Sequence, residues 1–520
     1  MKKQYISYMK SGLLLVACVT SMGVAAQGYS PAAMEQLKMK RLWFQSQNAA
    51  GTAFDNVQNY SNVILNYGKE DGSYCRPMDA QRLTKYGVSS EGFINLKSAY
   101  VWGAFNFSEV DKSEVGYNAG ITDPYRGMPY HLVDSYISDW RNQNYELKFR
   151  AATPVLGSHW AFGIEGTYIA TLSAKQRDPR VDARVYTLEL MPGVTYKLND
   201  NHKFGASFRY TSLKEEVNDA TQFGQLAHDS YRLNGLGNAV YKHKTNAIDA
   251  NYFGDRLGGA LQYNFTTNVW NVLLEGAYSV KAESAEVTFI SPEKWGTVKD
   301  KLAEVTLIAV RQGENFTNYV KADYQNRNID GCQYVTKKDE SESTEGWLEL
   351  DRNIRSTYKT SAAAFDYAIS KNRGSEYAWK VEAGVTYTKQ DDEFILPNSV
   401  QNYENLTFDL GAKINFVLSQ NFNRRLLVDV HGAYNSNLSG EYVYGGSNPD
   451  YITVTEMSQG VQNFYTSDYY RIGGSLTYSQ QVKEDARINM FGKLAFDYVG
   501  TSDYDYDKRT YLSVSLGCNF

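Results

Sequence analysis

The sequence holds little of what marks the common alternatives to a large all-β fold. Its 520 residues include only four cysteines, ten prolines and six histidines, and its mean hydropathy is -0.48. A polytopic helical membrane protein needs repeated apolar runs of about 20 residues, and a chain this polar excludes that class. The formal net charge of -5 is spread evenly, without the basic stripe of nucleic-acid-binding proteins. We therefore expect no nucleic-acid partner.

Catalytic and metal-binding signatures are also missing. There is no HExxH, no GxSxG, no P-loop and no dinucleotide fingerprint, and the histidines show no metal-ligand spacing. The cysteines that would remain after removal of an N-terminal leader are Cys75, Cys332 and Cys518. This odd, sparse count argues against a disulfide framework and a cysteine metal site. We expect no metal, no cofactor and no enzymatic activity.

The first 26 residues predict a signal peptide. A positive start precedes the apolar run that begins at Leu13–Ala17, and Val24-Ala25-Ala26 forms a small-residue cleavage site before Gln27. Residues 15–18 also fit a lipobox, which would leave a lipidated Cys18. The apolar stretch continues past Cys18, which favours ordinary cleavage. The chain is therefore expected to be exported.

Strict alternation of apolar and polar residues dominates the rest of the chain. At the C-terminus, five apolar residues alternate with small polar ones without a break: Leu512, Val514, Leu516, Cys518 and Phe520. A period of two predicts strands with one apolar and one polar face. Many such segments run to about 12–16 residues, longer than the usual strand of about 5 or 6. The 42 tyrosines, many near segment ends, are typical of interfacial girdles.

The connections between these segments alternate between short and long. Short turns, such as 154–158 and 372–375, alternate with long polar stretches, such as 216–256, 282–298, 329–359 and 391–403. Outer-membrane barrels have short periplasmic turns and longer outer loops. Residues 56–520 therefore predict an all-β fold, a transmembrane antiparallel outer-membrane β-barrel of about 16 strands (14–18). Ser61–Tyr67 and Gln81–Val88 could supply an additional pair.

Residues 27–55 differ from the barrel pattern. Ser30-Pro31 predicts a helix start, and the apolar residues after it follow one helical face. Two interpretations stay open: a plug inside the lumen, or a periplasmic extension of no fixed structure. The candidate plug residues are Trp43, Phe44, Asn48 and Gly51.

The polar strand faces predict a lumen with charges of both signs. The lumen-lining candidates are Asp409, Lys413, Asp429, His431, Arg471, Arg487, Lys493 and Asp497. A mixed interior indicates either an aqueous passage or a plugged lumen, without strong ion selectivity. Asp429-Val430-His431 is similar to the Asp-x-His of barrel proteases. Its place soon after a short turn favours a hydrogen-bonded pair lining the lumen instead.

Two families share features with this chain. The polar-aromatic strands, the terminal Phe520, and residues 41–44 with 48–55 resemble uncharacterised Bacteroidota outer-membrane barrels of a domain-of-unknown-function family. Asn48-Ala49-Ala50-Gly51 is also distantly similar to the Asn-Pro-Ala element of the long-chain fatty-acid transporter family. In that family the N-terminal segment plugs the barrel and the substrate is hydrophobic. Ala49 replaces the proline, and a charged interior does not suit an apolar tunnel, so the resemblance implies architecture only.

Three functions remain open for such a barrel in outer-membrane lipid. The favoured one is a channel or diffusion transporter for a small solute. The alternative is an accessory or scaffold barrel that binds a protein partner through long, tyrosine-rich extracellular loops such as 445–466. A barrel-embedded hydrolase is the least favoured of the three.

Overall fold

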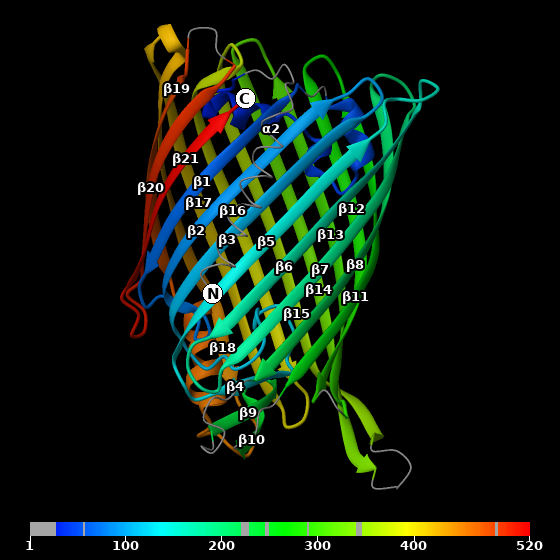
Figure 1. Cartoon of the computed structure of the whole chain (residues 1–520), viewed down its shortest axis with the longest axis vertical. Helices are drawn as coiled ribbons and strands as arrows, with labels where there is room; N and C mark the ends of the chain where they lie inside the picture. The colour runs from blue at the N-terminus through cyan, green and yellow to red at the C-terminus, as the bar shows by residue number, and fades with distance from the viewer. Residues whose placement is uncertain are drawn as a thin grey trace, which may run out of the picture.

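A computed structural model of the chain describes residues 28–55, 58–219, 228–244, 249–288, 291–339, 346–483 and 487–520. The expected signal peptide and Cys18 lie outside these residues. Within them, one antiparallel sheet of 18 strands forms the wall (Figure 1): β1 (Tyr60–Asp71), β2 (Ala80–Asn95), β3 (Tyr100–Val115), β5 (Ser138–Ala152), β6 (Trp160–Lys175), β7 (Val181–Lys197), β8 (His202–Asp219), β11 (Ala250–Thr266), β12 (Trp270–Val287), β13 (Glu293–Gln312), β14 (Phe316–Asp339), β15 (Gly346–Arg373), β16 (Glu376–Phe394), β17 (Ser399–Ser419), β18 (Arg424–Val443), β19 (Tyr469–Gln481), β20 (Asn489–Gly500) and β21 (Lys508–Asn519).

Pairing between the first and last strands closes the sheet into a barrel. Each wall strand pairs with its neighbours in chain order, and β1 pairs with β21 in the register Leu65↔Leu516. A closed sheet leaves no unpaired edge, as a sheet in hydrocarbon requires. The predicted antiparallel barrel is confirmed. Its 18 strands lie at the top of the predicted range, because the additional pair at Ser61–Tyr67 and Gln81–Val88 forms β1 and β2.

The two faces of the wall differ as the alternation predicts. On β21, Leu512, Val514 and Leu516 point outward, and Leu516 keeps 59% of its surface exposed. Ser513 and Ser515 between them point into the barrel, where Ser515 Oγ donates to Asn66 Oδ1 at 2.8 Å. Many large apolar side chains around the wall are exposed in the same way. A band of exposed apolar side chains on a closed barrel is the surface that lipid covers.

The two ends of the barrel are built differently, and we name them the turn end and the loop end. Connections at the turn end are short, for example 313–315 and 374–375, and α2 lies near this end (Figure 1). Several stretches that the sequence predicted as long loops are instead continued strands. The expected loop 329–359 is mostly the paired ends of β14 and β15, and 282–298 and 391–403 are largely strand too. Beyond the apolar band both faces of these strands are polar, so the alternation that indicates a strand is missing from this part of the sequence.

Shorter elements fill both ends of the barrel. The N-terminal segment (residues 28–55) forms α2 (Pro31–Met39), η1 (Trp43–Gln45) and η2 (Ala49–Phe54). As the Ser30-Pro31 pair predicts, Ser30 Oγ accepts from Ala33 N at 3.3 Å and Pro31 opens α2. The loop end carries a three-stranded sheet and a helical segment: β4 (His131–Asp134), β9 (His228–Gly235), β10 (Asn238–Lys244), η4 (Thr453–Ser458) and α3 (Gln459–Tyr465). No helix among the described residues is long and apolar enough to span a membrane.

Candidate functional site

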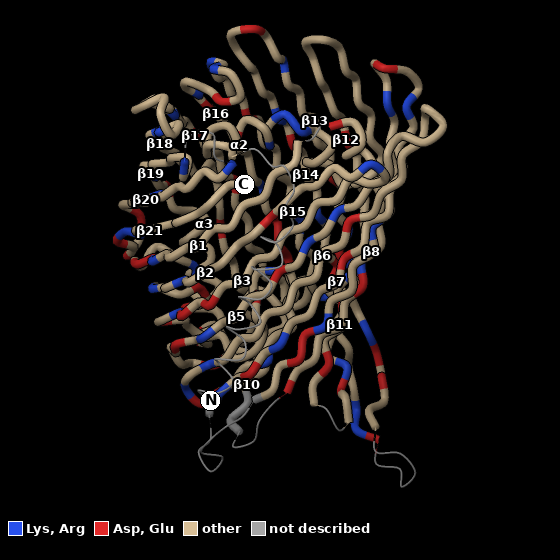
Figure 2. Tube along the Cα trace, turned by 45° about the horizontal axis from the view of Figure 1, so that its top comes forward, with Lys and Arg blue, Asp and Glu red and all other residues tan. Residues whose placement is uncertain are grey.

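Charged side chains of both signs line the inside of the wall. Strand alternation points Lys380 and Glu382 of β16 inward, whereas Val381 between them is exposed on the outside. Both signs also occur around the whole wall rather than on one side of it (Figure 2). The lumen is therefore polar without a single dominant charge.

An ion-pair cluster fixes α2 against the inner wall. Glu35 of α2 accepts from Lys380 Nζ at 3.0 Å and from Lys413 Nζ at 2.8 Å, and Tyr377 Oη donates to it at 2.8 Å. Burial would raise the pKa of Glu35, but the two lysines lower it to about 2. Glu382 lies 2.8 Å from Lys380 and 3.3 Å from Lys413, so two carboxylates share two ammonium groups. The predicted lumen residue Lys413 thus contacts the N-terminal segment.

Arg150 of β5 holds the next part of the N-terminal segment through its backbone. Its guanidinium donates to the carbonyls of Trp43 at 3.1 Å, Phe44 at 3.0 Å and Ser46 at 2.9 Å, and Nε donates to Glu165 at 2.8 Å. These carbonyls lie in and directly after η1, and the Trp43 carbonyl also accepts from Ser46 N at 3.1 Å. Arg150 is 4% exposed, so the contact is shielded from water.

Asp55 links the end of the N-terminal segment back to the start of η1. Its carboxylate accepts from the backbone N–H groups of Trp43 at 3.1 Å and Phe44 at 2.8 Å. Burial raises the pKa of Asp55 to about 7, and these bonds together with the charges of Arg41 and Arg150 oppose the shift. Trp43 is 1% exposed and packs with Leu42, Leu273, Ile308 and Val310. Phe44 meets Trp102 of β3 edge to face at 5.1 Å.

Three wall glycines let η2 approach the strands closely. A Cβ on Gly163 would lie 2.4 Å from the backbone nitrogen of Ala50, and a Cβ on Gly193 would lie 2.2 Å from Asn48 Oδ1. Gly205 is similarly close to Asn48 Nδ2. Asn48 Nδ2 lies within hydrogen-bonding distance of the carbonyls of Val194 and Ala206 and of Gln262 Oε1, at 2.9–3.2 Å.

The candidate plug residues therefore all lie inside the barrel. Trp43 and Asn48 contact the wall, Phe44 packs against β3, and Gly51 leaves room for the Trp43 ring, which a Cβ would meet at 2.0 Å. The segment touches strands on opposite sides of the lumen, from β5–β8 to β16 and β17. It thus crosses the turn end of the lumen.

Four of the predicted lumen residues form one cluster across β18, β19 and β20. Asp497 Oδ1 is 2.8 Å from His431 Nε2 and accepts from Arg471 Nε at 2.8 Å. His431 Nδ1 is 3.6 Å from Asp429 Oδ1. Gly473 makes this cross-strand contact possible, since a Cβ there would lie 2.3 Å from Asp497 Oδ1. The ring of His431 is thus placed between two carboxylates.

The other four predicted lumen residues are separate from this cluster, and one of them, Lys413, contacts Glu35 as described above. Asp409 lies beside Asp366 over Gly384, whose Cβ would meet Asp409 at 2.5 Å and Asp366 at 2.8 Å. Lys493 is exposed within β20. Arg487 precedes β20, in the connection from β19, and is exposed at the turn end.

A chamber of about 630 Å³ lies along the inner faces of β1, β2, β3, β5, β6, β20 and β21. Its charged lining includes Lys85, Glu146 and Asp497, together with asparagine, serine and threonine side chains. A second cavity of about 430 Å³ lies between the N-terminal segment and β14–β17, and Glu35, Lys380 and Asp409 line it. The lumen thus retains polar space beside the segments that occupy it.

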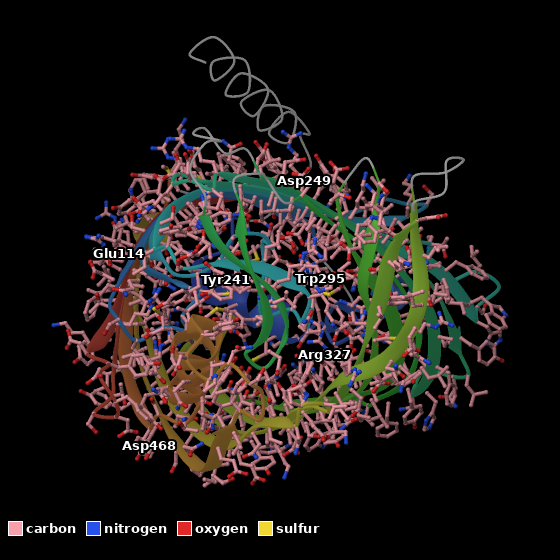
Figure 3. All side chains as sticks on the ribbon, turned by 90° about the horizontal axis from the view of Figure 1, so that it is seen from below. Glu114, Tyr241, Asp249, Trp295, Arg327 and Asp468 are labelled. Atoms are coloured by element: carbon pink, nitrogen blue, oxygen red, sulfur yellow. The ribbon has the colours of Figure 1, made fainter. Side chains whose placement is uncertain are left out.

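The inner loop (residues 116–137) fills the loop end of the lumen. Arg126 pairs with Glu215 and, at 2.6 Å, with Glu283, and both carboxylates are fully buried. Lys175 of β6 pairs with Asp134, both fully buried as well. Figure 3 views this end and labels Trp295, which packs with Tyr130 of the inner loop. Sequence reasoning identified neither Arg126 nor Arg150 nor Glu35, because each depends on where a loop or tail folds.

Of the comparisons with known proteins, a family model alone identifies a family for this chain. No curated protein matches the chain. Among solved structures it is similar to the ferric preacinetobactin receptor BauA of Acinetobacter baumannii (8% identity, 88% of this chain and 80% of that one, TM-score 0.39). It is also similar to a FadL homologue of Pseudomonas aeruginosa (12%, 95% and 99%, 0.37) and to the ferric yersiniabactin uptake receptor FyuA of Yersinia pestis (9%, 89% and 79%, 0.40). Residues 49–520 match the model of a family of unknown function, DUF6850, and the chain belongs to that family.

Proposed function

We propose that this protein is a gated outer-membrane passage for a small polar solute, exported by its N-terminal leader. The observation that carries the proposal is the chamber of about 630 Å³ inside a closed barrel, lined in part by charged side chains of both signs, with the N-terminal segment across one end of the barrel and the inner loop across the other. A barrel needs no such polar interior for stability, and a mixed-charge lumen suits passage of hydrated solutes.

The N-terminal segment is the proposed gate. It continues into the wall only at β1, and its ion-pair contacts are partly open to water: Glu35 is 30% and Lys413 is 23% exposed in their side chains. Ion pairs that water reaches contribute little net stability and are screened by salt. Its release would open the turn end without unfolding the barrel.

Single-channel conductance of the refolded protein in a planar bilayer tests this proposal. The experiment compares three proteins. They are the full chain, a variant that lacks residues 28–55, and a control variant in which an Asn-Gly turn replaces residues 334–352 of the β14–β15 hairpin. We expect large, stable conductance steps from the first deletion, and the same low or rare conductance from the control as from the full chain. If none of the three proteins conducts, although the thermal transition of each shows that it is folded, the proposed passage is wrong.

A second function, docking of a protein partner, is favoured by one observation. The β14–β15 hairpin projects beyond the other strands at the loop end (Figure 1). It carries exposed apolar side chains, among them Val335 at 49%, Leu348 at 50% and Leu350 at 61%. Apolar side chains in water mark interaction sites when they gather on one element. Crosslinking from this hairpin in native membranes to one defined protein, lost when 334–352 are replaced, is the result that this alternative requires.

A further inference from the structure

A small cavity at the loop end is separate from the chamber of about 630 Å³. It measures about 210 Å³ and lies between residues 124–131 of the inner loop, the η4–α3 segment and the inner faces of β14–β17. Arg327, one of its lining residues, lies inside the ring of strands in the view from the loop end (Figure 3). Ligand pockets for drug-sized molecules are about 300–1,000 Å³, so this cavity suits a smaller ligand.

Two buried hydrogen-bond acceptors in the lining have no donor within the protein. The first is Nε2 of His131, a residue that is 4% exposed. Nδ1 of the same ring lies 3.2 Å from the carbonyl of Met128, which can only accept, so Nδ1 carries the proton and Nε2 carries the lone pair. Burial lowers the pKa of His131 to about 4, which keeps the ring neutral.

The second acceptor is Oδ1 of Asp392, a residue that is 6% exposed. Its other oxygen accepts from Gln390 Nε2 at 2.5 Å. Tyr403 Oη donates to Gln390 Oε1 at 2.9 Å, which leaves Gln390 Nε2 to face the Asp392 carboxyl. A buried acceptor left without a donor costs about 1–3 kcal/mol, and two such atoms around one cavity indicate a ligand that donates hydrogen bonds.

The rest of the lining selects among hydrogen-bond donors. Tyr125, Tyr358 and Tyr465 supply ring surface, and prolines, methionines and Ile329 supply aliphatic surface. The guanidinium of Arg327 also borders the cavity, with Nε on Asp300 at 3.1 Å and Nη2 on the Arg126 carbonyl at 2.7 Å. Neutral hydroxyl groups can donate to both acceptors while the C–H faces of the same ring pack on the tyrosines, so a ring with several hydroxyl groups fits both parts of the lining.

We propose that this cavity is a binding site for a neutral polyhydroxylated ring of the size of one monosaccharide, held by hydroxyl donation to His131 Nε2 and Asp392 Oδ1 and by packing on Tyr125, Tyr358 and Tyr465. The site faces the loop end and needs no displacement of the N-terminal segment. It therefore goes beyond the proposed passage, and a barrel that does not conduct could still bind such a ligand.

Saturation-transfer NMR of the full chain in detergent tests the site. The probes are the methyl glycosides of glucose, galactose, mannose and N-acetylglucosamine, with choline as the cationic comparison. We expect saturable binding of at least one glycoside and none of choline. In D392N the bond from Gln390 would hold the amide oxygen in place and turn Nδ2 into the cavity, so an acceptor becomes a donor. We expect this variant to weaken binding about tenfold, because a buried hydrogen bond is lost and two donors are left facing each other.

Two further variants keep the test decisive. D391N is the matched control, because Asp391 is the next residue of β16 and its side chain is half exposed beside Lys389; it should bind like the unaltered chain. V461W fills the cavity from α3 and changes no residue of the wall, and it should abolish binding even if D392N fails to fold. Binding of choline alone, no glycoside binding, or glycoside binding unchanged in V461W and in folded D392N would each overturn the site.

Discussion

The two ends of the barrel are closed by segments that are held in different ways. The inner loop joins the wall at both of its ends, β3 and β5, and the carboxylates that pair with Arg126 and Lys175 are fully buried. The N-terminal segment joins the wall only at β1, and its ion pairs at Glu35 are partly exposed. Buried pairs are costly to break, whereas exposed pairs are weak. This difference is why we propose a fixed closure at the loop end and a releasable one at the turn end.

The largest effect is expected from breaking the fixed closure. Arg126→Met would leave Glu215 and Glu283 buried without their shared cation, and removal of one partner from a buried ion pair costs about 3–5 kcal/mol. Amide hydrogen exchange of residues 116–137, followed by mass spectrometry, should accelerate strongly. Arg82→Met, which removes an exposed pair with Glu114, serves as the control and should leave exchange there unchanged. Slow exchange in Arg126→Met would mean that the inner loop is not held by this pair.

The releasable closure should respond to pH through Asp55. Its pKa is raised from 3.8 in the free chain to about 7 in the docked segment, so docking favours the protonated carboxyl. This contribution is complete below about pH 4 and is lost as pH rises toward 7. With one pKa unit worth about 1.4 kcal/mol, the loss is about 4 kcal/mol. Glu35 has the opposite sign, since its lowered pKa weakens docking only below about pH 4.5.

Hydrogen exchange of residues 28–55 between pH 4.5 and 7 therefore tests Asp55. After correction for the intrinsic pH dependence of exchange, we expect protection to fall across this window in the unaltered chain. Asp55→Asn should flatten the profile, because the amide cannot ionise. A profile equally steep in both proteins would assign the pH response to another group.

Arg150 tests how the same segment is held through its backbone. Arg150→Met removes donors from the carbonyls of Trp43, Phe44 and Ser46, which at about 1 kcal/mol for each bond weakens docking by about 3 kcal/mol. Exchange of residues 42–48 should accelerate, and opening events in a bilayer should become more frequent. Arg141→Met on the same strand removes only an exposed contact with Asp111. If exchange of residues 42–48 is the same in both variants, Arg150 does not hold the segment.

The wall could be predicted from sequence because lipid and lumen impose opposite demands on alternate residues. β21 shows this fully, with Leu512, Val514 and Leu516 outside and serines inside. The signal disappears where strands leave the apolar band. In the outer part of β15, Glu349, Asp351 and Arg352 are as polar as a loop, so the sequence could not show that the hairpin continues.

The site could be predicted only as far as strand alternation extends. Alternation placed Lys380, Lys413 and Asp497 in the lumen, but it could not supply their partners. Glu35 reaches the two lysines from 345 and 378 residues away in the chain. Arg126 lies in a loop with no periodic pattern, and its partners belong to β8 and β12. Such pairings depend on where the segments fold, and one sequence holds no local signal for that.

The smallest predicted effect concerns the close approach of η2 to the wall. Gly163→Ala places a Cβ 2.4 Å from the backbone nitrogen of Ala50, so η2 must shift, and overpacking of this kind costs about 1–3 kcal/mol. Gly276→Ala is the matched control, because a Cβ there meets nothing within 4 Å. Exchange of residues 48–54 should rise in the first variant alone, while the thermal transition of the barrel stays the same in both. If Gly163→Ala instead lowered the barrel transition and left exchange of η2 unchanged, the glycine would serve the packing of the wall itself rather than the turn-end closure.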